Sequence, residues 1–160
     1  MDPPPARAAR PYADAVPCGM VEAGESFEAA AVREAHEEIG LSPDSIEVVG
    51  WLDDAWSGSG SYLVPYAALT PSRPAFTANP AEVEEILTPD VEELLRPAAR
   101  GEEMVEFRSG HYLNETIEFA GGSVFGLTAD LLLEALEWGQ GRTPRRGESR
   151  FRDLISYHQE

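Results

Sequence analysis

The sequence contains no lysine, a single cysteine and no long run of apolar residues. One cysteine, Cys18, excludes a disulfide bond within the chain, which fits a reducing compartment and leads us to expect a cytoplasmic protein. The short apolar runs exclude a membrane-spanning helix, and no signal-peptide pattern opens the sequence. We therefore expect no membrane partner. A length of 160 residues is enough for one domain with its own core.

Positive charge is also scarce. The 12 basic residues, all of them arginine, face 29 acidic residues, so the formal net charge is −17 at pH 7. A surface this acidic repels nucleic acid and anionic membranes, which excludes nucleic acid as a partner. The acid excess and the missing lysine lead to the hypothesis of a salt-adapted, halophilic protein. A GC-rich genome is the rival explanation for the arginine, although it leaves the acid excess unexplained.

Glutamate is abundant instead, and one stretch uses it in a fixed pattern. This stretch is Gly19 to Leu41, GMVEAGESFEAAAVREAHEEIGL. The spacing G-x5-E-x7-R-E-x2-E-E-x-G is filled by Gly19, Glu25, Arg33, Glu34, Glu37, Glu38 and Gly40. With this composition, chance would fill the pattern roughly once in a hundred thousand trials or less, so we interpret it as a motif.

The same stretch predicts a helix over residues 27–39. Ser26 is a suitable N-cap, and Gly40 sits where a left-handed C-cap belongs. The helical period places four apolar residues on one expected core face: Ala31, Val32, Ala35 and Ile39. His36 points away from the acidic arc described next, so we interpret it as a surface or supporting residue rather than a ligand.

Three carboxylates, those of Glu34, Glu37 and Glu38, share the neighbouring arc because residues three and four apart meet on a helix. Crowded carboxylates repel each other, and a hard cation with oxygen ligands, such as Mg2+, best explains their proximity. Arg33 lies on another side, where we expect it to fix the preceding loop through Glu25. The alternative is a solvated acidic face, which is how we interpret the acid pairs at 84–85, 92–93 and 102–103.

The remaining pattern predicts one α/β domain over residues 16–139, between an irregular segment, 1–15, and an arginine-rich tail, 140–160. Strands are predicted at 46–52, 62–69, 82–87, 105–107 and 112–119, with Pro65 interrupting the second. Helices are predicted at 89–95 and, capped by Thr128, at 129–139. Loops are predicted at 53–61 and 70–80. This order favours a mixed β-sheet with flanking helices.

The stretch from Gly19 to Leu41 resembles the Nudix box, G-x5-E-x7-R-E-U-x-E-E-x-G-U, where U is aliphatic or small and apolar. The resemblance implies an α/β/α sandwich in which the box forms a loop, a helix and a second loop. It also implies an enzyme that uses Mg2+ or Mn2+ to hydrolyse a small-molecule nucleoside diphosphate linked to another moiety.

The resemblance assigns roles to individual residues. It implies that the metal is held by the Gly19 carbonyl together with Glu34, Glu37 and Glu38. It gives Arg33 and Glu25 the task of holding the loop and the helix together. It leaves the general base open among the carboxylates of the box, Glu34 and Glu37 included, and two downstream candidates, Glu82 and Glu85.

Segments outside the box resemble the coenzyme A diphosphatase branch of the family: VVGWLDD at 48–54, NPAEVEEIL at 79–87 and VFGLTADLLLEAL at 124–136. This implies cleavage of coenzyme A to phosphopantetheine and adenosine 3′,5′-bisphosphate. The chain departs from the branch before Gly19, where VPCG replaces F-P-G-G and no upstream L-L-T-x-R-S motif is present. The strands that normally precede the box are also missing, so we expect an incomplete sheet whose exposed edge could form a homodimer.

The substrate contacts stay open between two interpretations. Trp56 and Tyr62 flank a Ser/Gly loop and could stack on an adenine, or they could simply pack together. Arg73 and Arg108 could meet phosphates. Three alternatives to the coenzyme A activity remain: hydrolysis of ADP-ribose, a dinucleotide or a damaged nucleotide; a non-catalytic Nudix domain that binds a nucleotide or a protein; and a translated fragment without function.

Overall fold

The computed structural model describes residues 15–57, 59–70, 74–107 and 110–141. The predicted segments 1–15 and 140–160 fall almost wholly outside these ranges, as do Arg73 and Arg108. The first half of the chain contains α1 (Phe27–Ile39), β1 (Glu47–Trp51), β2 (Ala55–Trp56), β3 (Tyr62–Leu63) and β4 (Tyr66–Leu69). The second half contains α2 (Val91–Leu94), β5 (Arg100–Phe107), β6 (Gly110–Phe119), β7 (Gly122–Phe125) and α3 (Gly126–Gly139). Short 3₁₀ turns occupy Pro43–Ser45 and Pro97–Ala99.

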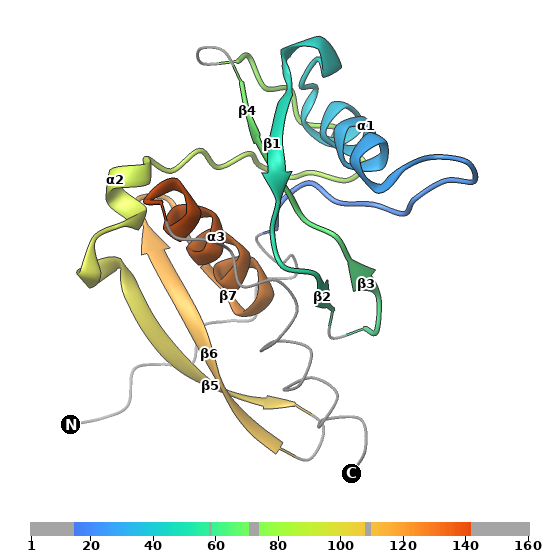
Figure 1. Cartoon of the computed structure of the whole chain (residues 1–160). Helices are drawn as coiled ribbons and strands as arrows, with labels where there is room; N and C mark the ends of the chain where they lie inside the picture. The colour runs from blue at the N-terminus through green and yellow to red at the C-terminus, as the bar shows by residue number, and fades with distance from the viewer. Residues whose placement is uncertain (1–14, 58, 71–73, 108–109, 142–160) are drawn as a thin grey trace, which may run out of the picture.

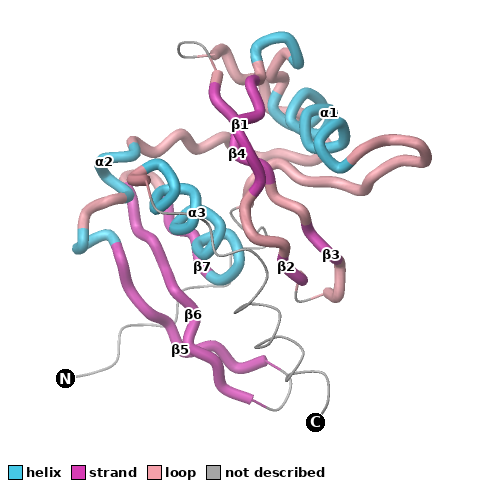
Figure 2. The backbone as a smooth tube through the Cα atoms, in the orientation of Figure 1, coloured by secondary structure: helices cyan, strands magenta, loops and turns pink. Residues whose placement is uncertain are grey.

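The strands form three small sheets, and helices lie beside them (Figures 1 and 2). Strand β1 pairs with β4, β2 pairs with β3, and β5, β6 and β7 form a meander. Every pairing among the described residues is antiparallel, so the parallel component of the expected mixed sheet is not found in this part of the chain. The combination of helices and sheets confirms the α/β class.

Most predicted elements are present with shifted bounds. Pro65 separates β3 from β4, as its missing amide requires. Strand β5 begins at Arg100 rather than 105, and α3 begins at Gly126, two residues before the predicted cap Thr128. In both cases the element begins earlier than predicted, and the ends of helices and strands are where the sequence signal is weakest.

Two of the predicted loop and strand assignments were wrong. The segment 53–61 is not only a loop, since it contains β2, whose two residues are too few to give an alternating pattern. The segment 82–87 is not a strand. There the backbone carbonyl of Asn79 accepts hydrogen bonds from the amides of Glu82 and Val83, at 3.0 and 2.8 Å, so the chain turns where an extended strand was expected.

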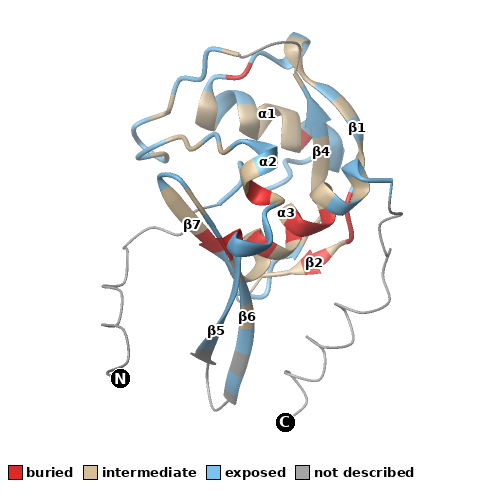
Figure 3. Ribbon diagram, turned by 90° about the vertical axis from the view of Figure 1, so that its left-hand side faces the viewer, coloured by how far each residue is buried: buried red, intermediate tan, exposed pale blue. Residues whose placement is uncertain are grey.

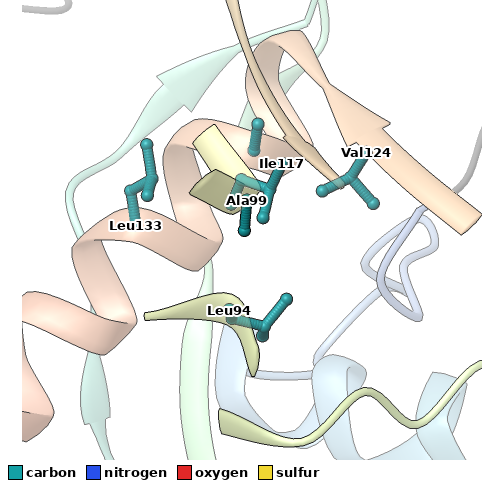
Figure 4. Packing of buried hydrophobic residues seen from close by; sticks show 6 residues of the cluster. Leu94, Ala99, Ile117, Val124 and Leu133 are labelled. Carbon is teal, nitrogen blue, oxygen red and sulfur yellow. The ribbon is translucent and has the colours of Figure 1, made fainter. Parts of the chain in front are cut away.

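The main apolar core lies between α3, α2 and the β5–β7 sheet (Figure 4). Ile117 is fully buried there, with 0% of its surface exposed. The other members are small or branched side chains that meet it from the surrounding elements: Leu94, Ala99, Val124, Ala129 and Leu133. Burial is concentrated in this region, whereas α1 is mostly exposed or half-buried (Figure 3). No helix among the described residues is long and apolar enough to cross a membrane.

Helix α1 is packed differently from its prediction. Ala30 is its one buried residue, and Ala30 lies on the same side as Glu34 rather than on the expected core face. The four residues of that expected face are only half-buried. The acidic side of α1 is therefore turned toward the preceding loop.

Candidate active site

Local signals fix both ends of helix α1. The Ser26 hydroxyl oxygen accepts a hydrogen bond from the amide of Ala29 at 3.1 Å. Gly40 adopts the left-handed conformation with φ of 68°, and its amide donates to the carbonyl of His36 at 3.0 Å. Both cap predictions are confirmed. The His36 ring lies at this end, 3.2 Å from the Leu41 carbonyl.

Arg33 ties the loop before α1 to the helix. Its Nε donates to Glu25 Oε1 at 2.9 Å, and its Nη2 donates to the Met20 carbonyl at 2.9 Å. The Arg33–Glu25 contact is the one that the sequence predicts. The hydrogen bond with Glu25, followed by a second one with Glu34, raises the pKa of Arg33. In return, Arg33 lowers the pKa of the Glu25 carboxyl. The loop is thus fixed by charge-assisted bonds rather than by apolar packing.

The same guanidinium also reaches two of the three predicted metal ligands. Arg33 Nη1 lies 2.7 Å from Glu34 Oε1 and 3.0 Å from Glu37 Oε2. Sequence reasoning missed these contacts because it placed Arg33 by the direction of its Cα–Cβ bond alone. A long side chain can curl back to a neighbour four residues on, and this i, i+4 spacing was the signal that could have revealed the pair.

Gly19 allows the close approach of the Glu34 carboxyl group. A Cβ atom added at Gly19 would overlap the Glu34 carboxyl group. The side chain of Glu34 is mostly buried, and its carboxylate therefore rests directly on the loop backbone. The box glycine and the box glutamate are thus brought together, as the resemblance implies.

Glu38 stands among other acids. Burial is the first cause of its raised pKa, a hydrogen bond from the Cys18 backbone opposes that effect, and the charges of Glu34, Glu82 and Glu37 raise it further. Glu82 comes from the turn at residues 79–83, which lies between β4 and α2 in the chain. The amide of Asn79 in that turn donates to the Glu38 carbonyl at 2.8 Å.

We name Glu34, Glu37, Glu38 and Glu82 the acidic cluster. Of the two downstream candidates for a general base, Glu82 belongs to it. Glu85 is exposed and is not among the charges that raise the pKa of Glu38.

The acidic cluster has the chemistry that Mg2+ or Mn2+ prefers. Carboxylate oxygens and a backbone carbonyl are hard ligands. After burial, the negative charges of Glu34, Glu82 and Glu37 contribute to the raised pKa of Glu38. As arranged here, however, no set of three or more acidic, histidine or cysteine side chains in the described ranges forms a closed cation site. Arg33 already pairs with Glu34 and Glu37, so ligation by both would require the guanidinium to move.

Trp56 and Tyr62 pack against each other across the β2–β3 pair. Their ring centroids are 5.4 Å apart at an interplanar angle of 56°. The Tyr62 hydroxyl donates a hydrogen bond to Asp54, which raises the pKa of Tyr62. Because 44% of Tyr62 remains exposed, the pair is both packed and accessible.

Comparison with known proteins gives concordant results. The NUDIX domain family model matches residues 5–108. Nudix hydrolase 22, chloroplastic, of Arabidopsis thaliana is 34% identical over 111 residues, which cover 66% of this chain and 37% of that protein. Nudix hydrolase 15, mitochondrial, of the same plant is 31% identical over 120 residues, covering 71% and 42%.

A bacterial relative extends further along this chain. An uncharacterized Nudix hydrolase NudL of Enterobacter sp. is 31% identical over 128 residues, covering 78% of this chain and 66% of its own length. This chain spans less than half of either plant relative. The box geometry, the family model and these relatives agree, and the chain belongs to the Nudix family.

Proposed function

We propose that this chain is a metal-dependent hydrolase that cleaves a nucleoside diphosphate linked to another moiety, with Mg2+ or Mn2+ as cofactor. The observation that carries the proposal is the acidic cluster, in which Glu34 rests on Gly19, and in which burial first and then three neighbouring carboxylates raise the pKa of Glu38. Such a concentration of carboxylates is costly unless a cation or an arginine offsets it. Membership of the Nudix family supports the same reaction class.

Each residue has a proposed task. Glu34, Glu37 and Glu38 would hold the cation together with the Gly19 carbonyl. A bound divalent cation would supply charge neutralisation and a more acidic water. Arg33 and Glu25 keep the loop against the helix, so that the Gly19 carbonyl and the carboxylates stay in register. Glu82, which lies beside Glu38 but outside the box helix, is our choice for the general base.

Coenzyme A is the proposed substrate, on the basis of the segments at 48–54, 79–87 and 124–136 described above. The exposed Tyr62 and its neighbour Trp56 offer an aromatic surface for the adenine. The bacterial relative is named uncharacterized, so its name adds no substrate. The discriminating test is a panel of coenzyme A, ADP-ribose and a dinucleotide with either metal, at low and at molar KCl. Cleavage of ADP-ribose or the dinucleotide alone would replace coenzyme A as the substrate.

The variant Glu38→Gln tests the metal assignment. It keeps the shape of the side chain but removes the charge, so we expect hydrolysis to fall by about 100-fold or more and Mn2+ affinity to fall with it. Glu102→Gln, an exposed acid on β5, is the matched control and should change neither. Turnover retained in folded Glu38→Gln would contradict the assignment. A folded parent protein that cleaves nothing in the panel would favour the non-catalytic alternative.

A further inference from the structure

Helix α3 carries a buried acid that the box chemistry does not use. Glu134 is 8% exposed and lies on a helix whose other buried residues are Ala129, Leu131 and Leu133. Its Oε1 accepts a hydrogen bond from the backbone amide of Asp53 at 2.7 Å. A carboxylate is a costly choice for filling an apolar position, so we ask what this contact accomplishes.

The backbone geometry at Asp53 explains the contact. The preceding amide, that of Leu52, donates to the carbonyl of Pro65, the residue before β4, at 2.9 Å. Successive amides of an extended segment point in opposite directions, so the Asp53 amide faces Glu134 rather than Pro65. Asp53 is 6% exposed, and a buried amide needs an acceptor. Glu134 supplies it from 81 residues away in the sequence.

A second contact shows that one side of α3 holds this part of the chain. Trp138 lies one helical turn after Glu134, and a Cβ atom added at Gly50 of β1 would come within 2.6 Å of its ring. Trp138 therefore sets how closely α3 packs on β1, while Glu134 bonds to the backbone just beyond the end of β1. Apolar packing permits sliding, whereas a hydrogen bond to one amide fixes a position.

The segment fixed in this way leads directly to the aromatic pair. Asp54, the next residue, accepts the hydrogen bond from the Tyr62 hydroxyl. Trp56 packs against Tyr62, and the β2–β3 pair that carries both rings consists of two residues in each strand. So short a pair is not stable by itself and needs an external anchor. The buried Ala55 and the Glu134 bond provide one.

We propose that Glu134 is a positioning residue that sets the orientation of Asp54, Tyr62 and Trp56, which we call the aromatic corner. The inference about substrate rests on the proposed function, because it makes the aromatic corner the surface that receives the base of the nucleotide. Glu134 itself touches no substrate. It acts through the Asp53 backbone, so its loss should weaken substrate binding more than the chemical step.

The test uses three substitutions at one position. Glu134→Gln keeps an oxygen at the same reach, so it should retain the bond to the Asp53 amide. Glu134→Ala removes the acceptor, and Glu134→Asp shortens its reach by one methylene. Glu137→Ala, an exposed acid one turn along the same helix, is the control for a general change in α3.

Two readouts separate positioning from a merely structural role. The first is the part of the near-UV circular dichroism that Trp56→Phe removes from the parent spectrum, which reports the order of the aromatic corner without substrate. The second is the separation of KM from kcat. We expect Glu134→Ala and Glu134→Asp to lose that signal and raise KM about three- to tenfold with kcat within about twofold, while Glu134→Gln and Glu137→Ala resemble the parent.

The outcomes are distinguishable. If Glu134→Ala fails to fold, Glu134→Asp carries the same comparison with a smaller change in packing. A Trp56 signal unchanged in both variants would overturn the proposal. An equal loss in Glu134→Gln would also overturn it, because the bond to Asp53 would then not be the cause. The parent protein could also cleave no nucleotide while its Trp56 signal is still lost in Glu134→Ala and Glu134→Asp. That result would support the positioning role of Glu134 and contradict the proposed function.

Discussion

Helices α1 and α3 have similar lengths, 13 and 14 residues, yet they are held in place by different interactions. Around α3, branched apolar side chains converge on the fully buried Ile117. Around α1, one buried alanine is accompanied by a network in which Arg33 bonds the loop and the carboxylates. The stability of this protein and the geometry of its candidate site therefore depend on separate sets of residues. Three substitutions test this separation of roles.

The largest effect on stability is expected at Ile117. Ile117→Ala leaves a cavity at the centre of the α3 region and should lower the free energy of unfolding by about 2–5 kcal/mol. Chemical denaturation measures this loss directly. Met104→Ala removes an exposed side chain and should change the same quantity by less than about 0.5 kcal/mol. A small loss at Ile117 would show that the two regions are not held differently after all.

The opposite pattern is expected at Gly19. In Gly19→Ala, the new methyl group must displace the Glu34 carboxylate, which is the end of a flexible side chain. We therefore expect about tenfold weaker Mn2+ binding and slower hydrolysis, with unfolding free energy within about 0.5 kcal/mol of the parent. Gly139→Ala, where an added Cβ meets nothing, is the control. Metal binding unchanged in Gly19→Ala would remove Gly19 and Glu34 from the site.

The smallest expected effect is on the alkylation rate of Cys18, the single cysteine, whose thiol senses the negative charge of the acidic cluster. Cys18 is exposed, but partial desolvation by nearby atoms, then the charges of Glu38 and Glu34, raise the pKa of its thiol. Less reactive thiolate is therefore present at pH 8 than for an ordinary cysteine. Glu38→Gln removes one negative charge and should shift the alkylation profile to lower pH, with a rate about two- to fivefold higher at pH 8.

Iodoacetamide labelling followed by mass spectrometry gives that rate. Glu102→Gln should leave it unchanged, because Glu102 is not among the charges that raise the Cys18 pKa. Mg2+ should accelerate labelling of the parent in the same direction as Glu38→Gln if the cation binds at the cluster. If neither Glu38→Gln nor Mg2+ changed the labelling rate, the negative charge of the acidic cluster would have no effect on the Cys18 thiol.

Sequence reasoning succeeded where the interaction is local. Ser26 and Gly40 act within one helical turn, and the Arg33–Glu25 pair spans eight positions of one loop and helix. The box pattern carries all of this information in consecutive residues. Glu82 was identified as a candidate only as one of two downstream glutamates that folding could bring near the box, and the strand predicted for it was wrong.

The contacts that sequence could not supply are those that depend on tertiary packing. Nothing in the residues around Glu134 indicates that its carboxylate accepts a hydrogen bond from the Asp53 amide, because the two meet only after α3 has packed on β1. The core face of α1 was predicted from the helical period alone. The structure instead buries Ala30, which shares its side of the helix with Glu34, the residue that meets Gly19.

Arg33 gives the box an internal counter-ion. Its guanidinium already pairs with Glu34 and Glu37 and also binds the Met20 carbonyl, so we expect the loop and helix to assemble without an external cation. In this respect the box differs from small zinc-dependent domains, whose folding requires the metal. A chelator should therefore abolish the proposed metal-dependent hydrolysis while leaving the fold intact. Adding the cation back should restore hydrolysis without a refolding step.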